Sequence, residues 1–536
     1  MIRTNVEQSI EKSAASPASG TGRRHSVSVT VLLLAAGYAA SGCTSARSAP
    51  ETTSAAPAAL AATPAAACTT VTPCATTTIS IDTTRTTPVP RGFSGFNYTI
   101  RAIGNEADFA AAVKSVSPGW IRYPAGTGSQ AFDWSTGESP DAMVAVWAGL
   151  YDAHADKLET AQRTLAGMDG GDMVGPFSAF ATGAGAAGLV VSVNGFTDTD
   201  TSAGDFAHYA KENSIEVLAW ELSNEPYLYP LFYPSDAGLS DGTVYATQMK
   251  PFYDAIHKKD ASAVVSLFES PSDSQWLAGY GEPYWDAISL HDYNQTAATD
   301  IQGRMTFYDE YLAHGLVPYY LPYVELGKPI VVSEFAPGGP DGDPLDGCLY
   351  YGVYAAEYIL RLSTPMPTPA AEPGVRYVGL DTLDGADGID PDDAGATAEI
   401  EAVGVANLGV RQAGQAYATT VEGSPDVTFP PSPALLPAVP AIYAQAYEGN
   451  DQNGHLVITN KGSAAVPISI QADGSPFQAS GVAVTQVSPP GSDAGPSTTI
   501  ASVESTTIAG RFPASFTVPP YSVVHLQWPI AVSALP

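Results

Sequence analysis

Two glutamates stand at the ends of strongly apolar runs, where a carboxylate could attack a carbon atom or donate a proton. Glu225 follows the run from Val217 to Asn224, and Glu334 follows Ile330-Val331-Val332-Ser333. Such runs predict strands that are buried on both faces, and neither glutamate has a sequence-local reason to stand there. A lone glutamate at a strand end is usually an exposed loop residue. Two of them in these settings favour a pair that does chemistry.

Eight strand-like runs, separated by Ala-rich amphipathic stretches, are available to position these carboxylates. The alternation predicts an α/β fold, a closed (β/α)8 TIM barrel ringed by helices. A doubly wound open sheet is the alternative, but no Gly-rich phosphate loop follows the first strand. The predicted strands are Phe93–Tyr98, Trp120–Tyr123, Leu189–Asn194, Val217–Asn224, Ala263–Phe268, Ala287–His291, Ile330–Glu334 and Arg376–Asp381. The predicted helices include Glu106–Ser115, Thr160–Thr182, Thr243–Lys259, Ile301–His314 and Tyr350–Leu362.

The barrel places both glutamates at one edge. The active site of such a barrel lies at the C-terminal ends of its strands. Glu225 follows the fourth predicted strand and Glu334 ends the seventh. We therefore expect the two side chains to face each other across the mouth.

After about Pro430 the helical periodicity stops and short strands recur between turn residues. This pattern predicts a C-terminal antiparallel β-sandwich domain, and the strand-like Thr76–Asp82 could pair with it. We expect residues 76–91 to give a strand to the sandwich, 92–425 to form the barrel and 426–536 the sandwich. The predicted sandwich strands are Leu456–Thr459, Val466–Gln471, Gly481–Ser488, Ser515–Val518 and Ser522–Gln527.

The first 43 residues have the pattern of an export signal. Arg23 and Arg24 precede an apolar run from Val27 to Ala40 that is too short to span a bilayer. The small residues ending at Cys43 also resemble a bacterial lipobox, so a lipid anchor at Cys43 is one alternative. Residues 44–75 are rich in Ala, Pro and Thr and predict a disordered tether. We expect an exported protein that is periplasmic, secreted or anchored to a membrane through a lipidated N-terminus.

Composition and charge limit the partners. Of 536 residues, 45% are hydrophobic and 10% aromatic, which excludes a generally disordered chain. Lys and Arg number 23 against 55 Asp and Glu, a formal charge of −32. Such a surface repels phosphate backbones, so we expect no nucleic-acid partner. It also argues against a long sulfated polymer and favours a small or lightly charged substrate.

The cysteines fit an exported chain. Cys68 and Cys74 are close enough in sequence for a small disulfide loop, which would leave Cys348 as a free, buried thiol. No Cys/His spacing resembles a metal site, and we expect neither a metal nor a cofactor.

The motifs around both glutamates resemble a known group of enzymes. Asn224-Glu225-Pro226 and Ser333-Glu334-Phe335 are similar to the acid/base and nucleophile motifs of retaining glycoside hydrolases of clan A. Within that clan, the string from Ile121 to Thr127, IRYPAGT, resembles the second-strand motif of glycoside hydrolase family 79, which contains β-glucuronidases and heparanase. Families 39 and 51 carry related strings. The clan often has a Trp at the eighth strand, where this chain has Leu380-Asp381-Thr382-Leu383.

The resemblance implies a double displacement. Glu334 would be the nucleophile and Glu225 the general acid and later the base, with the carboxyl groups about 5–5.5 Å apart. We then expect a raised pKa for Glu225 in the free enzyme, because the proton donor must keep its proton while its neighbour is ionised.

The same resemblance implies the residues that surround the sugar. Asn224 would bind the sugar 2-hydroxyl, and Arg122 would hold Glu334 ionised. His291 and Tyr293 resemble the clan's His/Tyr pair, in which the Tyr hydroxyl contacts the nucleophile. We also expect Asn97 and Thr127 to bind substrate.

A glycine pair after the nucleophile suggests which sugar is bound. Gly338 and Gly339 resemble the family 79 loop whose backbone amides hold a glucuronate carboxylate. On this basis we expect an exo-acting β-glucuronidase. One alternative is a clan A glycosidase for a neutral sugar, such as a β-xylosidase, an arabinofuranosidase or an endo-β-glucanase. The other is a non-catalytic carbohydrate-binding lipoprotein.

Overall fold

The computed structural model describes residues 77–98, 107–124, 126–140, 174–228, 241–338, 343–366, 374–383, 388–390, 394–427, 438–491 and 494–530. The predicted signal at 1–43, the tether at 44–75, Cys43 and the Cys68–Cys74 pair lie outside these ranges. Among the described residues, no helix combines the length and the apolar character needed to cross a bilayer.

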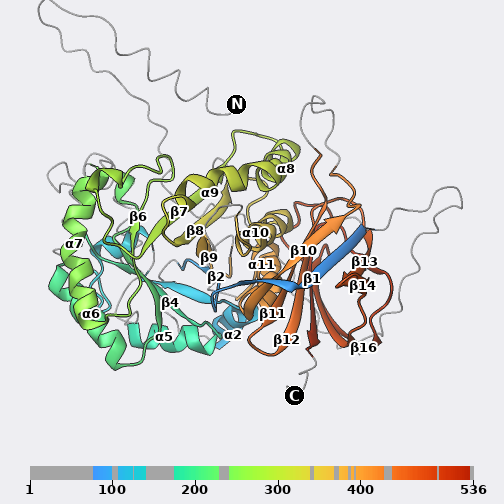
Figure 1. Cartoon of the computed structure of the whole chain (residues 1–536), viewed down its shortest axis with the longest axis horizontal. Helices are drawn as coiled ribbons and strands as arrows, with labels where there is room; N and C mark the ends of the chain where they lie inside the picture. The colour runs from blue at the N-terminus through green and yellow to red at the C-terminus, as the bar shows by residue number, and fades with distance from the viewer. Residues whose placement is uncertain are drawn as a thin grey trace, which may run out of the picture. The chain divides into compact units, whose positions relative to one another are not determined.

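Eight parallel strands close into a barrel (Figure 1). The first strand pairs with the eighth through Ser94–Val378, Gly95–Gly379 and Phe96–Leu380, which confirms the barrel and excludes the open sheet. An interior layer that includes Trp120, Val190 and Val331 fills it. The strands are β2 (Ser94–Phe96), β3 (Trp120–Tyr123), β4 (Gly188–Val193), β5 (Val217–Leu222), β6 (Val265–Phe268), β7 (Ala287–Gln295), β8 (Ile330–Gly338) and β9 (Val375–Leu380).

Helices follow most of these strands and bury apolar faces against the barrel. The predicted helix at Ile301–His314 passes through a π-helical turn, η5 (Tyr311–Gly315), and continues as another helix to Val324. The helices are α2 (Ala107–Ser115), α5 (Val174–Gly183), α6 (Asp200–Glu212), α7 (Gly242–Lys259), α8 (Ile301–Glu310), α9 (Leu316–Val324), α10 (Leu349–Leu362) and α11 (Ala398–Val410). Short 3-10 turns are η2 (Thr127–Ala131), η3 (Pro226–Leu228) and η4 (Ala278–Tyr280).

The remaining strands form a second, mainly antiparallel sheet around its own core. They are joined in one hydrogen-bonded sheet of ten strands, and the pair β1–β13 is parallel. As expected from its pattern, β1 near the N-terminus lies among the C-terminal strands (Figure 1). The strands are β1 (Thr77–Pro88), β10 (Ala413–Glu422), β11 (Ile442–Gly449), β12 (Asn453–Asn460), β13 (Val466–Ala472), β14 (Ser475–Pro476), β15 (Ser480–Ser488), β16 (Ser502–Arg511), β17 (Phe516–Val518) and β18 (Ser522–Pro529).

The boundary expected at residue 425 is wrong. β10 pairs with β1 and β11, so it is a strand of the second sheet, and the last barrel helix already ends at Val410. The sequence at Ala413–Glu422 contains small and polar residues that carry no strong alternation, and the pairing partner β1 lies more than 300 residues away. Strands β11, β14 and β16 were missed as well.

A buried ion pair joins the barrel helices to the second sheet. The ammonium group of Lys461, after β12, donates to Glu357 Oε1 at 2.9 Å and Oε2 at 3.0 Å. Arg361 holds the same carboxylate from one turn further along α10. Cys348, at the N-terminus of α10, is buried as the sequence predicted, and its thiol donates to the carbonyl of Ser497 at 3.1 Å.

Candidate active site

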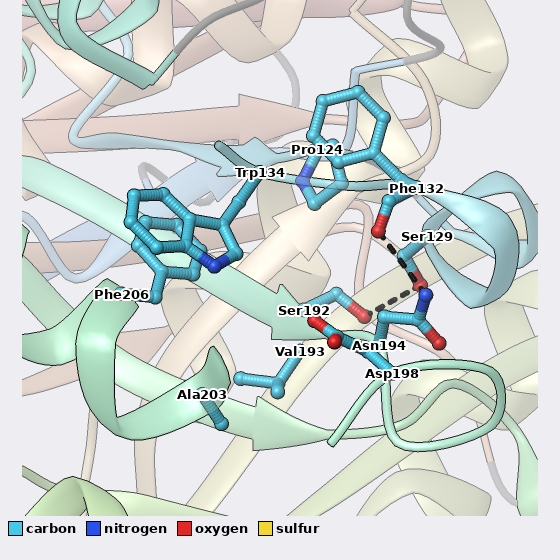
Figure 2. A pocket seen from close by; sticks show the side chains of 10 residues that line it. All are labelled: Pro124, Ser129, Phe132, Trp134, Ser192, Val193, Asn194, Asp198, Ala203 and Phe206. Atoms are coloured by element: carbon cyan, nitrogen blue, oxygen red, sulfur yellow. Dashed lines mark hydrogen bonds between the residues drawn. The ribbon is translucent and has the colours of Figure 1, made fainter. Parts of the chain in front are cut away.

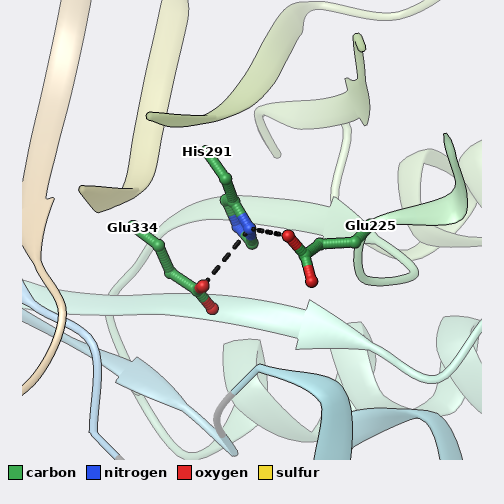
Figure 3. A group of neighbouring side chains, drawn as sticks. All are labelled: Glu225, His291 and Glu334. Atoms are coloured by element: carbon green, nitrogen blue, oxygen red, sulfur yellow. Dashed lines mark ion pairs between the residues drawn. The ribbon is translucent and has the colours of Figure 1, made fainter. Parts of the chain in front are cut away.

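Glu225 and Glu334 lie together at the C-terminal edge of the barrel. Glu225 follows β5, the fourth barrel strand, and Glu334 lies in β8, the seventh. A carboxylate oxygen of Glu225, a ring nitrogen of His291 and a carboxylate oxygen of Glu334 all lie within 4.8 Å of one another (Figure 3). The two carboxyl groups thus have the close spacing of a retaining pair, well below the ~6.5–9.5 Å of an inverting pair.

The chain turns sharply where it presents Glu225. Ser223 has φ 71° and Glu225 has φ 45°, both in the left-handed region that non-glycine residues seldom adopt. Gln130 of η2 braces this turn, because its amide nitrogen donates to the carbonyl of Asn224 at 2.9 Å and its oxygen accepts from Ser223 Oγ at 3.1 Å. Strained backbone of this kind persists where the surrounding structure holds it, often at functional sites.

Glu334 is held by contacts from three other parts of the barrel. Oε1 accepts from Arg122 of β3 and from Asn97 Nδ2, directly after β2, at 3.3 Å, and Oε2 is in hydrogen-bond contact with the hydroxyl of Tyr293 of β7. A Cβ atom at Gly126 would lie 2.7 Å from Oε1, so only glycine fits beside this carboxylate. The donors fix the direction in which Glu334 points.

Arg122 is the centre of the buried network. Its Nε donates to Glu221 at 2.8 Å, Nη1 to Glu334 and Nη2 to Asn224 Oδ1 at 2.9 Å. Ser289 Oγ donates to the other oxygen of Glu221 at 2.7 Å. The guanidinium is fully buried, and all three of its nitrogens are used.

His291 lies between the two candidate carboxylates. Its Nδ1 is 3.0 Å from Glu225 Oε1 and 3.3 Å from Glu334 Oε2 (Figure 3). Burial lowers the pKa of His291, but the charges of Glu334 and Glu225 outweigh it and leave the pKa above its ordinary value. Nε2 lies 3.2 Å from Ser333 Oγ.

The structure reverses the expected pKa order of the two carboxyl groups. Burial raises the pKa of Glu334 to about 7, and the neighbouring Asp381 and Glu225 add to the rise. Burial also raises the pKa of Glu225, but His291 and a 3.0 Å bond from the Tyr227 hydroxyl outweigh it, so the net shift is downward. Sequence alone could not predict this, because His291 touches both groups only in the folded chain.

Most of the predicted site residues meet at this edge. Asn97, Arg122, Asn224, His291 and Tyr293 lie around the two glutamates.

The predicted glycine loop does not present a free amide at Gly338. Its N–H donates to the Tyr308 hydroxyl at 2.7 Å, so this amide is already used within the protein. Gly339 lies outside the described residues. Thr127 begins η2 next to Gly126.

The sequence did not predict the contacts that three further residues make in the site. Asp381, directly after β9, accepts from Asn97 Nδ2 at 2.8 Å and from the Tyr293 hydroxyl at 2.7 Å. Glu221 is the partner of Arg122, and Tyr227 donates to Glu225. Asp381 stands where clan A often has a Trp. This departure from the clan pattern was the sequence feature that could have marked Asp381 as a site residue. Glu221 looked like part of an apolar strand.

The same cluster has ligand types that metals use. Among the described residues, Glu225, His291 and Glu334 are the group whose geometry could hold a metal ion. The Arg122 guanidinium bonded to Glu334 supplies a fixed positive charge at that carboxylate. This arrangement suits proton transfer and nucleophilic attack better than cation binding.

A separate cavity near β4 is too small for a sugar. It is lined by residues that include Trp134, Phe206, Asn194 and Asp198 (Figure 2), and its volume is about 10 Å³. A cavity of that size holds one water molecule at most.

No protein-family model and no curated protein sequence matches the chain. Solved structures do resemble it. The α-L-arabinofuranosidase from Thermotoga maritima, solved with arabinose, is 18% identical, with a TM-score of 0.58 over 85% of this chain and 100% of that one. The GH51 arabinofuranosidase from Xanthomonas axonopodis pv. citri is 15% identical, with a TM-score of 0.58 over 84% and 99%.

A family 44 xyloglucanase from Paenibacillus polymyxa is 14% identical, with a TM-score of 0.53 over 85% and 99% of the two chains. These neighbours are clan A glycoside hydrolases, and at such identities the likeness establishes a shared fold. The resemblance to family 79 stays a prediction.

Proposed function

We propose that the protein is a retaining glycoside hydrolase that acts on a neutral sugar. The observation that carries the proposal is the close approach of Glu225 and Glu334, within 4.8 Å, at the ends of the fourth and seventh barrel strands. A retaining mechanism needs two carboxyl groups at about this spacing. The fold shared with arabinofuranosidases and a xyloglucanase supports it.

Glu334 is the better nucleophile of the two. Arg122 and Asn97 donate to one of its oxygens and the Tyr293 hydroxyl contacts the other, so the carboxyl group is held in one orientation and its attacking oxygen is aimed. It would attack the anomeric carbon and form a glycosyl ester as the bond to the leaving oxygen breaks. Water would then cleave that ester and restore the carboxylate.

Glu225 is the better proton donor and acceptor. Its side chain is 17% exposed against 6% for Glu334, and it lies beside His291 at the open side of the cluster. It would protonate the leaving oxygen in the first step and take a proton from water in the second. Because the charges of Glu225, His291 and Glu334 act on one another at 3.0–3.3 Å, the titrations seen in a rate profile belong to the cluster.

Charge favours a neutral sugar. In the described part of the site, the cations Arg122 and His291 already face protein carboxylates. Asp381 adds another acidic group beside Glu334. A uronate would meet these negative groups, and the Gly338 amide expected to receive it is bonded to Tyr308. The glucuronide hypothesis therefore has less support than its neutral alternative.

A panel of p-nitrophenyl glycosides tests the proposal. We expect turnover of the α-L-arabinofuranoside, the β-D-xyloside or the β-D-glucoside, and little turnover of the β-D-glucuronide. Glu334→Gln should lower kcat by about 10⁴-fold or more, since covalent catalysis is lost. Glu225→Gln should keep activity mainly on substrates with good leaving groups, which do not need a proton donor.

The matched control is Glu282→Gln, at an exposed site between η4 and β7, which should behave like the wild type. Product configuration by proton NMR adds a second readout. An inverted product, or full activity in Glu334→Gln, would contradict the mechanism. Absence of turnover on all glycosides and on arabinan, xylan and β-glucan would favour a binding protein instead.

A further inference from the structure

Asp381 and Glu334 are two carboxyl groups joined by two shared donors. The amide nitrogen of Asn97 lies 2.8 Å from Asp381 Oδ1 and 3.3 Å from Glu334 Oε1. The Tyr293 hydroxyl lies 2.7 Å from Asp381 Oδ2 and also contacts Glu334 Oε2. An amide nitrogen has two hydrogens and can serve both carboxylates at once.

The Tyr293 hydroxyl cannot do the same, because it carries one hydrogen. Burial, with the charges of Asp381 and Glu334, raises the pKa of Tyr293 far above its ordinary value, so the hydroxyl stays protonated. If Tyr293 donates its hydrogen to one of the two carboxyl groups, its oxygen can form a hydrogen bond with the second carboxyl group only when that second group carries a proton. The geometry therefore implies one additional proton on the chain Asp381–Tyr293–Glu334.

The charges around Glu334 point the same way. Arg122 of β3 and protonated His291 of β7 are the cations that face it. The acidic groups are Glu334 itself, Glu225, Asp381 and, behind Arg122, Glu221. Four ionised carboxylates against two cations would leave two buried negative charges in excess, and one shared proton removes half of that excess.

We propose that Asp381 is a positioning residue that shares a proton with Glu334 through the Tyr293 hydroxyl and so sets when the nucleophile is ionised. The inference rests on the proposed function for its consequence in catalysis. In the resting form Glu334 holds the proton and donates it to the Tyr293 oxygen, while Tyr293 donates to Asp381. When substrate enters, Glu334 passes its proton to the Tyr293 oxygen and the hydroxyl proton passes to Asp381.

The relay balances. Glu334 becomes a carboxylate, Asp381 becomes a carboxylic acid, and Tyr293 keeps one hydrogen, which now points at Glu334. The hydrogen bond then steadies the nucleophile as it attacks. In the glycosyl ester the proton stays on Asp381. When water cleaves the ester and frees Glu334 as a carboxylate, the relay runs back through the Tyr293 hydroxyl and restores the resting form.

Two variants that shift the titration of Glu334 in opposite directions test this. Asp381→Asn removes a negative neighbour, so the acidic limb of kcat/KM should move down by about one to three pH units. Tyr293→Phe removes a donor but keeps both carboxyl groups, so the limb should move up and kcat should fall by about 10²-fold. The matched control is Asp426→Asn, an exposed residue after β10, which should shift nothing.

A readout without substrate separates this inference from the proposed function. The protein is labelled with ¹³C at the glutamate side-chain carboxyl carbon, and the Glu334 signal is assigned by its loss in Glu334→Gln. Wild-type Glu334 should titrate near neutral pH, and lower in Asp381→Asn.

An unchanged Glu334 titration in folded Asp381→Asn overturns the shared proton, whatever the activity. Should that variant fail to fold, an unchanged titration in Tyr293→Phe overturns it too. If the wild type turns over no glycoside but the titrations shift as expected, the proposed function fails and the shared proton stands.

Discussion

At the scale of single residues, Arg122 holds the site together. Its side chain is fully buried, and it bonds Glu221, Glu334 and Asn224 at once. A buried guanidinium loses its hydration, and it is stable here because two carboxylates and an amide oxygen replace the water. The same bonds orient the candidate nucleophile and the residue next to the candidate acid. Stability and geometry therefore depend on one side chain.

Arg122→Met should destabilise the fold and abolish activity. Glu221 is fully buried and Glu334 nearly so, and the substitution leaves Glu221 without its cation and Glu334 with His291 alone. We expect a loss of about 3–5 kcal/mol in the free energy of unfolding, measured by urea denaturation. Arg122→Met combined with Glu221→Gln should recover part of the stability but no activity. Equal stability of Arg122→Met and wild type would contradict the role.

At the scale of elements, the side chains of β7 alternate between the face that contacts the two glutamates and the face that packs against the helices. His291 and Tyr293 face the glutamates, and Asp292 between them points to the opposite face. There Asp292 Oδ2 accepts hydroxyls from Tyr311 at 3.2 Å, Tyr320 at 3.1 Å and Tyr358 at 2.5 Å. Successive side chains of a strand point to opposite faces. Helices α9 and α10 and the turn η5 therefore hold β7 through Asp292, while His291 and Tyr293 on the other face contact the glutamates.

The turn after β5 has strained backbone at two residues, Ser223 and Glu225. Glu225 has φ 45°, which costs a residue with a Cβ about 1–2 kcal/mol relative to glycine. Glu225→Gly and Glu225→Ala both remove the carboxylate, so their difference isolates the backbone. We expect both to be inactive, and the glycine variant to be more stable than the alanine variant by about 1 kcal/mol in thermal or urea unfolding. The reverse order would contradict strain at this turn.

At the scale of the whole molecule, the barrel and the second sheet meet at a buried histidine pair. His455 of β12 and His525 of β18 stack with ring nitrogens 3.0 Å apart, and a Cβ at Gly409 of α11 would lie 3.3 Å from the His525 ring and 3.5 Å from His455 Cβ. Burial lowers the pKa of His525 to about 3 and that of His455 below its ordinary value, although Asp451 opposes the shift at both rings. Both rings are therefore neutral near pH 7.

This pair should make the molecule acid-sensitive. The unfolded chain binds protons on these rings near pH 6.5 and the folded chain does not, so stability is full above that pH and falls toward about pH 3. His525→Phe should reduce the slope of the free energy of unfolding against pH by about 1.4 kcal/mol per pH unit between pH 6 and 4. His208→Gln, at an exposed position on α6, should leave the slope unchanged. Equal slopes in His525→Phe and wild type would show that the ring titrates alike in both states.

The amino-acid sequence by itself determined the barrel, its strand order and the two glutamates. Apolar runs such as Ile330–Ser333 are long and local, and each ends in a residue that the parallel fold must place at one edge. Motif resemblance added Arg122, Asn224, His291 and Tyr293, which the structure brings to the same cluster. The weakly patterned strand β10 was missed because its pairing with β1 is the main evidence for it.

Only the tertiary structure decided how the site is charged. Asp381, after β9, meets Asn97, after the neighbouring strand β2, and Tyr293 of β7, although the three residues are far apart in sequence. The sequence predicted that the Gly338 amide binds a substrate carboxylate, but in the folded chain this amide donates to the Tyr308 hydroxyl. His291 reverses the expected pKa order because it touches both glutamates. The residue type determines which reactions a side chain can take part in. Its protonation state depends on burial and on neighbouring charges, and these are present only in the folded chain.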